Sequence, residues 1–139
     1  MPNKATVLVD INILLDGLQK REPFFETSAH LLALIETGKV RGYVASHNIT
    51  TLFYLIKKDK SAAEARPTIT NLLQFIKVAA VDQNTIEQVL HLDYRDYEDA
   101  VQMISAVQCK ADCLITCNIE DYQPPLLSVL KPVEFLATI

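Results

Sequence analysis

This chain of 139 residues has no long hydrophobic run and no recognisable export signal. Every apolar run is well short of the roughly 18 residues that a membrane-spanning helix needs. The N-terminus "MPNKATVLVD" lacks the basic start and long apolar centre of a signal peptide. Half of the residues are hydrophobic, which is too many for a disordered chain. We therefore expect a cytoplasmic protein that does not enter a membrane and that folds as a single domain over residues 1–139.

Cysteine and positive charge are also in short supply. The three cysteines, Cys109, Cys113 and Cys117, form no C-x-x-C pair, so we expect reduced thiols and no disulfide framework. The formal net charge is −4, which argues against a protein that coats nucleic acid without specificity, because neutralising phosphates needs clustered Lys and Arg. An enzyme with one local basic groove remains compatible with this charge. The three histidines follow no metal-binding spacing, and we expect them at the surface or between helices.

Short apolar runs alternate with segments of helical period along the chain. The segment "TVLVD" at 6–10 is short, continuous and rich in β-branched residues, which is typical of a buried strand. Further strands are predicted at 41–46, 77–82, 112–116 and 126–130, and helices at 24–38, 47–58, 61–76, 83–92 and 97–108. Such alternation implies parallel βαβ units with helices on both faces of the sheet. We predict an α/β fold, a three-layer α/β/α sandwich around a central parallel sheet of four to five strands.

Acidic residues stand where these strands end. Asp10 directly follows the first strand in an apolar run, where an unpaired charge is costly. The segment "TCNIED" follows the fourth strand, and "DYEDA" opens a later helix. The carboxyl ends of parallel strands share one edge of a sheet, so carboxylates from distant parts of the chain are expected to meet there. A hard divalent cation would offset their mutual repulsion, since Mg²⁺ and Mn²⁺ prefer oxygen ligands. The sequence therefore predicts a metal site that includes Asp10.

Three segments resemble the PIN domain family over nearly the whole chain. "VLVDINILLD" resembles the opening of a PIN domain, "EDAVQMISAVQCKADCLITCNIEDY" resembles its second half, and "KPVEFLA" is similar to its C-terminal helix. The resemblance implies a PIN-like fold and hydrolysis of RNA phosphodiester bonds with Mg²⁺ or Mn²⁺. Small single-domain members are frequently VapC-type toxins of toxin–antitoxin pairs and often dimerise. The resemblance thus also implies an antitoxin partner and a homodimer.

The resemblance also assigns roles to individual residues. The metal ligands that would carry catalysis are Asp10, Asp99 and Asp121. The polar residues that would support them are Ser46, Thr116 and Asn118. One position departs from the family, because Thr51 stands where a Glu is common, so one of the usual four carboxylates is missing. Glu98 is the expected substitute.

Each of these residues also has a purely structural interpretation. Asp10 could cap a helix at "INILLDG", and Asp96 and Asp99 have the three-residue spacing of a capping box. Glu98 could be a solvated acid in the first turn of a helix, favoured by the helix dipole. Asp121 and Asn118 could belong simply to a loop or a turn.

Two other classes of function stay open at this point. The first is a phosphatase of the haloacid dehalogenase type, which needs a second Asp two residues after Asp10, where this chain has Asn12. The second is a non-catalytic PIN module that binds RNA or a protein partner, which the missing Glu at Thr51 favours. Metal titration combined with an RNA cleavage assay separates these alternatives from a ribonuclease.

Overall fold

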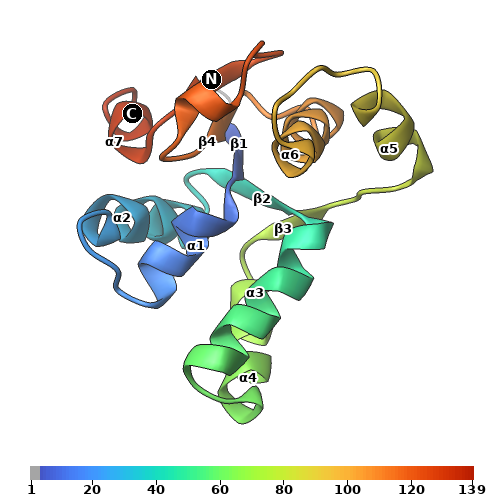
Figure 1. Cartoon of the computed structure of the whole chain (residues 1–139). Helices are drawn as coiled ribbons and strands as arrows, with labels where there is room; N and C mark the ends of the chain where they lie inside the picture. The colour runs from blue at the N-terminus through green and yellow to red at the C-terminus, as the bar shows by residue number, and fades with distance from the viewer. Residues whose placement is uncertain (1–3) are drawn as a thin grey trace.

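The computed structural model describes residues 4–139, and in this range a five-stranded parallel sheet forms the centre of the molecule (Figure 1). The strands are β1 (Thr6–Val9), β2 (Arg41–Ala45), β3 (Lys77–Ala79), β4 (Cys113–Ile115) and β5 (Ser128–Leu130). Their order across the sheet is β3-β2-β1-β4-β5, and all neighbours pair in parallel. The predicted α/β fold with four to five parallel strands is confirmed.

Helices connect the strands in the predicted alternation. They are α1 (Ile11–Leu18), α2 (Phe25–Glu36), α3 (Ser46–Asp59), α4 (Ala62–Leu72), α5 (Gln83–Val89), α6 (Tyr97–Gln108) and α7 (Pro132–Leu136), with a short 3-10 turn, η1 (Ile119–Asp121). The ends differ from the prediction in places. The helix predicted to reach residue 76 ends at Leu72, and the strand predicted to reach residue 82 ends at Ala79.

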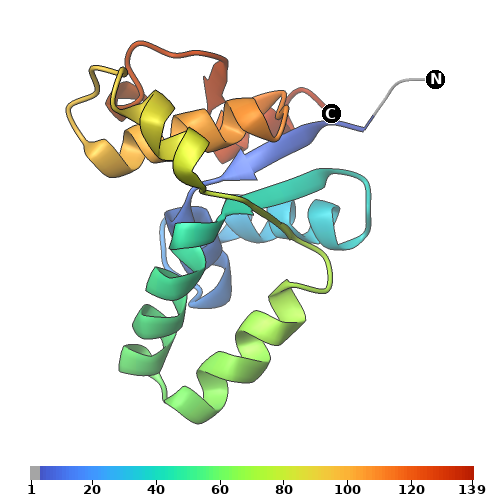
Figure 2. The same ribbon diagram turned by 90° about the vertical axis from the view of Figure 1, so that its right-hand side faces the viewer.

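The central strand β1 is covered on both faces. Val7, Leu8 and Val9 are all fully buried, which explains why this strand is continuously apolar rather than alternating. Val7 and Val9 belong to a core shared with α1, α2, α3, α4 and α7, whereas Leu8 belongs to a second core with α6. Figures 1 and 2 show the corresponding layers, with α5 and α6 on one side of the sheet and α1 and α2 on the other.

Helices α3 and α4 form a pair that extends away from the sheet (Figure 2). Leu52 and Ile56 of α3 pack with Ile69 of α4 in the same core as Val7. α3 begins directly at the end of β2, so its first turn stands at the carboxyl edge of the sheet while its last turn lies far from it. Helix α3 therefore runs from the carboxyl edge of the sheet to the end of the α3–α4 pair that lies farthest from the sheet.

Two further sequence expectations can be compared with the fold. Within residues 4–139, no helix is both long and apolar enough to cross a membrane. The three cysteines are free, with Cys113 buried in the sheet, as the sequence predicted. Burial raises the pKa of the Cys113 thiol to about 11, with the charge of Asp112 adding to the effect, so this thiol is protonated at neutral pH.

The buried face of α3 can be tested by mutation. Leu52 is fully buried, so Leu52→Ala should lower the free energy of unfolding by about 2–5 kcal/mol, because it removes apolar contacts and leaves a cavity. Lys58→Ala, at an exposed position of the same helix, is the matched control and should cost under about 0.5 kcal/mol. Urea unfolding of both variants measures the difference, and equal losses would contradict this packing.

Candidate functional site

Asp10 lies at the junction of β1 and α1, next to the end of β4. Its backbone N–H donates to the carbonyl of Ile115 at 3.0 Å, and its side chain is buried, with the residue only 7% exposed. Asp10 occupies the N-cap position of α1 but makes no side-chain capping hydrogen bond. Its carboxylate instead accepts from Thr116 Oγ1 at 3.0 Å and from Gln102 Nε2 at 3.4 Å. The side-chain hydrogen bonds of Asp10 therefore come from residues far along the chain.

Thr116 is the principal partner of Asp10. It directly follows β4 and is fully buried. Its hydroxyl donates to Asp10 and accepts from the backbone N–H of Asn118 at 3.1 Å. The chain after β4 thus holds the Asp10 carboxylate in one orientation. Asn118 contributes through its backbone, and its side chain is exposed.

Electrostatic interactions join Asp10 to the acids of α6 and η1. Burial raises the pKa of Asp99 to about 6, with the charges of Asp96, Asp121 and Asp10 adding to the effect and the Tyr122 hydroxyl opposing it. Asp99 is therefore close enough to interact electrostatically with both Asp10 and Asp121, the other two acids assigned to the site. Asp96 is the N-cap of α6, accepting from the Asp99 backbone N–H at 3.1 Å, as expected from their spacing.

The pKa of Asp10 is also raised. Burial is the main cause, and the charge of Glu98 adds to it. The Thr116 hydroxyl and the backbone N–H groups of Asn12 and Ile11 oppose the shift because they stabilise the carboxylate. The hydrogen-bond donors around Asp10 thus only partly offset the cost of burying its charged form.

Asp99 and Asp121 open onto a common hollow of about 260 Å³, which we call the acid hollow. Its lining residues are Asp93, Arg95, Asp96, Asp99, Glu120, Asp121 and Gln123. Five of these seven are acidic, and Arg95 supplies a positive charge at the same place. The hollow is an electronegative site at the carboxyl edge of the sheet, open to a ligand from solvent.

The chemistry of these donors suits a hard divalent cation, although they are not preset around one. Among residues 4–139, no three His, Cys, Asp or Glu side chains stand in a metal-binding arrangement. The oxygen ligands present at the site are nevertheless those that Mg²⁺ and Mn²⁺ prefer, and Mg²⁺ commonly binds through one or two carboxylates and several waters. Burial is the main cause of the raised pKa of Asp99, and the repulsion from neighbouring acids that adds to it is the penalty that such a cation would offset.

The remaining predicted residues lie on two helices beside Asp10. Ser46 is the first residue of α3 and is partly buried, whereas Thr51 is exposed further along the same helix. Glu98, at the start of α6, is exposed. Burial raises the pKa of Asp10 and lowers the pKa of His47, and the charge of Glu98 adds to the first shift and opposes the second. Glu98 is thus an electrostatic neighbour of Asp10. Within residues 4–139, neither the Ser46 nor the Thr51 side chain makes a hydrogen bond to Asp10.

Three buried polar residues near the site were missed by the sequence analysis. Gln102, which contacts Asp10, lies one turn after Asp99 within the buried stripe of α6. Tyr122, only 1% exposed, directly follows Asp121 and lies near Asp99. Asn48 is fully buried in the first turn of α3, and its side-chain amide has no partner within residues 4–139. Gln102 and Asn48 could have been found from the sequence, because each is a polar residue at a core position of a helix.

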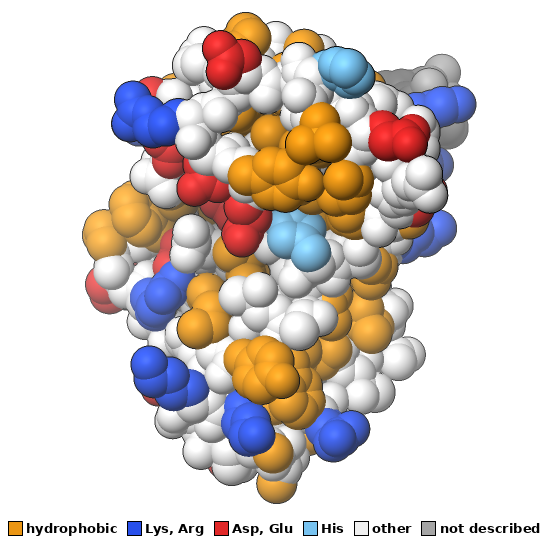
Figure 3. All heavy atoms as spheres, turned by 45° about the vertical axis from the view of Figure 1, so that its right-hand side comes forward, with side chains coloured by type: hydrophobic (Ala, Val, Ile, Leu, Met, Phe, Trp, Pro, Cys, Tyr) orange, Lys and Arg blue, Asp and Glu red, His pale blue; other side chains and the backbone are white. Residues whose placement is uncertain are grey.

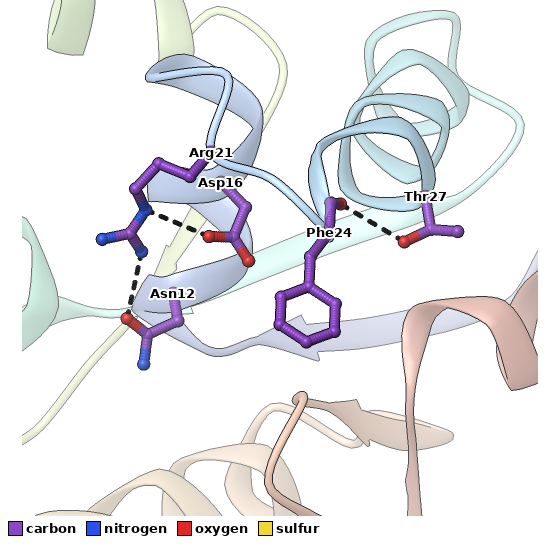
Figure 4. A network of polar contacts seen from close by, with 5 residues as sticks. All are labelled: Asn12, Asp16, Arg21, Phe24 and Thr27. Atoms are coloured by element: carbon purple, nitrogen blue, oxygen red, sulfur yellow. Dashed lines mark hydrogen bonds and ion pairs between the residues drawn. The ribbon is translucent and has the colours of Figure 1, made fainter.

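A separate polar network fixes α1 immediately after Asp10 (Figure 4). Arg21 Nε contacts Asp16 Oδ1 at 3.1 Å, and Arg21 Nη2 donates to Asn12 Oδ1 at 3.4 Å. The Asp16 side chain is only 8% exposed, so this ion pair is partly shielded from solvent. Asn12 is therefore held by Arg21 at the position where a dehalogenase-type phosphatase would carry its second catalytic Asp.

The pKa of Asp99 leads to a prediction for the metal-free protein. Its pKa is about 6 in the folded chain and ordinarily 3.8, so as pH rises between these values the unfolded chain ionises first and stability falls. Asp99→Asn removes this loss. We expect the variant to melt at a higher temperature than the wild type at about pH 7.5, with the gap closing toward about pH 4. Thermal unfolding with a chelator measures the gap, and a gap independent of pH would contradict the assignment.

A family model described as the PIN domain matches residues 6–120 of this chain. The comparison with curated proteins finds no match. The similar solved structures share less than 25% identity with this chain and show the fold.

Three of these structures are informative. A toxin–antitoxin complex from Klebsiella pneumoniae is 20% identical, with a TM-score of 0.69 over 91% of this chain and 97% of that one. VapBC2 from Rickettsia felis, bound to a promoter DNA fragment, is 16% identical, with a TM-score of 0.66 over 89% and 96%. VapC20 from Mycobacterium tuberculosis, a toxin that cleaves the sarcin–ricin loop, is 14% identical, with a TM-score of 0.61 over 78% and 86%.

Proposed function

The chain belongs to the PIN domain family, and from this premise we propose that it is a Mg²⁺- or Mn²⁺-dependent ribonuclease that hydrolyses RNA phosphodiester bonds. One observation carries the proposal. Asp10 follows β1, Asp99 lies in the first turn of α6 and Asp121 lies in the turn after β4, yet Asp99 interacts electrostatically with both of the others. A fold that only needed stability would gain nothing from this repulsion, whereas a cation-binding site requires it.

A divalent ion would be held by Asp10, Asp99 and Asp121, with Glu98 as a further acid beside Asp10. When bound, it supplies positive charge that stabilises the negative charge developing on the scissile phosphate. PIN domains generally use divalent metal ions, which supports this assignment. The all-oxygen donor set favours Mg²⁺ or Mn²⁺ over softer metals.

The protein's own residues orient these acids. Thr116 and Gln102 donate to the two oxygens of Asp10, so its carboxylate keeps one orientation while the substrate enters. The Asn118 backbone N–H holds the Thr116 hydroxyl in turn. In this scheme no side chain is a covalent nucleophile, and a water attacks the phosphorus in line with the leaving oxygen. Arg95, in the acid hollow, is placed to contact a phosphate oxygen of the RNA.

We further propose that the protein is the toxin of a toxin–antitoxin pair, acts in the cytoplasm and binds an antitoxin protein. The support is that its structural neighbours from Klebsiella pneumoniae and Rickettsia felis are toxin–antitoxin assemblies. A homodimer also remains a prediction, which size-exclusion chromatography with light scattering would test. Growth arrest on expression, relieved by Asp10→Asn, is the expected cellular behaviour of a toxic ribonuclease.

The second candidate is a non-catalytic PIN module that binds RNA or a protein. The observation that favours it is Thr51, which is exposed at the position where the family commonly has a Glu. Mn²⁺ binding without RNA cleavage by the wild type would identify this case. The dehalogenase-type alternative has no support, because the chain is a PIN domain and Arg21 holds Asn12.

The proposed function is tested by replacing the acids with amides. Asp10→Asn and Asp99→Asn should each lower Mn²⁺ affinity and RNA cleavage by more than the roughly 10- to 100-fold typical of losing an outer-shell partner. The fold should persist, because amide and carboxylate are nearly isosteric. Calorimetry measures Mn²⁺ binding, and gel analysis of a mixed RNA substrate measures cleavage.

Glu36→Gln is the matched control, since it makes the same chemical change at an exposed residue at the end of α2. It should leave both Mn²⁺ affinity and cleavage at wild-type levels. Wild-type Mn²⁺ affinity in both Asp10→Asn and Asp99→Asn would overturn the metal-site assignment.

A further inference from the structure

A second hollow is lined by Glu98, whose charge also acts on Asp10. It has a volume of about 240 Å³ and lies between the starts of α3 and α6 and one side of α5. Its lining residues are His47, Val81, Ile86, Tyr97, Glu98 and Val101. On this face of the molecule, Figure 3 shows hydrophobic side chains that adjoin acidic side chains and a histidine. We call this site the base hollow.

The lining combines apolar side chains and an aromatic ring with unused hydrogen-bonding groups. Val81, Ile86 and Val101 supply apolar surface, and Tyr97, at the start of α6, is 52% exposed. Both ring nitrogens of His47 are buried, and neither has a hydrogen-bond partner within residues 4–139. A neutral imidazole offers one donor and one acceptor. This set fits a planar ligand with apolar faces and a polar edge.

The negative charge of Glu98 limits the kinds of ligand that the base hollow can bind. Glu98 lines the base hollow and also interacts electrostatically with Asp10 and His47. An anionic group such as a phosphate would be repelled there, whereas a neutral heterocycle would not. The hollow is also adjacent to the acids, so one strand of RNA can place a phosphate at the acids and a neighbouring base beside Tyr97.

We propose that the base hollow binds an unpaired nucleobase of the RNA, stacked on Tyr97 and hydrogen-bonded at its edge by His47. The proposal rests on the proposed function, since it names how that substrate is held. Proteins recognise single-stranded RNA largely by stacking bases on aromatic side chains and by hydrogen bonds to base edges. The base hollow would therefore make cleavage depend on the base next to the scissile phosphate.

The test measures binding separately from cleavage. Fluorescence anisotropy follows labelled single-stranded homopolymer oligoribonucleotides of about ten nucleotides, in a chelator so that the RNA stays intact. Tyr97→Leu and His47→Ala should each weaken binding of the preferred oligoribonucleotide about 5- to 100-fold, the range expected for the loss of one base–aromatic stack. An oligonucleotide with abasic central positions should bind wild type and Tyr97→Leu equally.

Tyr54→Leu is the matched control, because Tyr54 is 62% exposed on α3 and does not line the base hollow. The affinity of Tyr54→Leu for the preferred oligoribonucleotide should lie within about twofold of the wild-type affinity. Tyr97 is half exposed, so its replacement leaves the core intact and keeps the test valid if His47→Ala fails to fold. Wild-type affinity in Tyr97→Leu, or an equal loss in Tyr54→Leu, would overturn the base hollow.

The cleavage assay separates failure of this proposal from failure of the proposed function. If the wild type cleaves RNA and Tyr97→Leu binds RNA normally, the base hollow is wrong and the ribonuclease assignment stands. If Tyr97→Leu loses binding but the wild type cleaves no RNA, the base hollow is supported and the ribonuclease assignment fails. If the wild type binds none of the oligoribonucleotides, the base hollow is overturned.

Discussion

The hydrogen bond from the Thr116 hydroxyl to the Asp10 carboxylate, 3.0 Å long, is the contact on which the site depends. It joins the ends of the two central strands, which also meet through the Asp10 backbone N–H and the Ile115 carbonyl. Without the Thr116 hydroxyl, the buried Asp10 carboxylate would lose its shortest side-chain hydrogen bond and keep only the longer contact with Gln102 and the backbone N–H groups of the first turn of α1.

The start of α6 faces both hollows. Asp99 looks onto the acid hollow, while Tyr97 and Glu98 line the base hollow. Asp96 caps the start of α6 and so helps to fix the relative position of Asp99, the proposed metal ligand, and Tyr97, the proposed base contact. The proposed RNA path needs a rigid separation between phosphate and base, and a capped helix provides it better than a loop would.

The sequence predicted the sheet and its helices well because both signals are local. Strand β1 is continuously apolar, and parallel strands buried on both faces have this pattern. Asp10 could be singled out for the same reason, as a charge in an apolar run. The rule that parallel strands share one carboxyl edge predicted that acids would meet near Asp10. The resemblance to the PIN family then singled out Asp99 and Asp121 among them.

What the sequence could not show depends on tertiary placement. Gln102 and Tyr122 are ordinary polar residues until the fold buries them beside the acids. His47 follows no metal-binding spacing, and its unpartnered nitrogens become visible only when α6 is placed against the start of α3. Thr51 was identified by comparison with a family pattern, but the direction in which it faces is set by the packing of α3, where Leu52 takes the buried position.

The pairing of Asp10 with Thr116 spans 106 residues of sequence, which has a consequence during synthesis. A ribosome delivers the chain from its N-terminus, so β1 emerges long before β4, its neighbour at the centre of the sheet. Contacts of such long sequence separation form late and fold slowly. A nascent or truncated chain that stops before Thr116 would carry Asp10 without its partner. The order of translation would thus leave the Asp10 carboxylate without this hydrogen bond until the segment that contains Thr116 has been made.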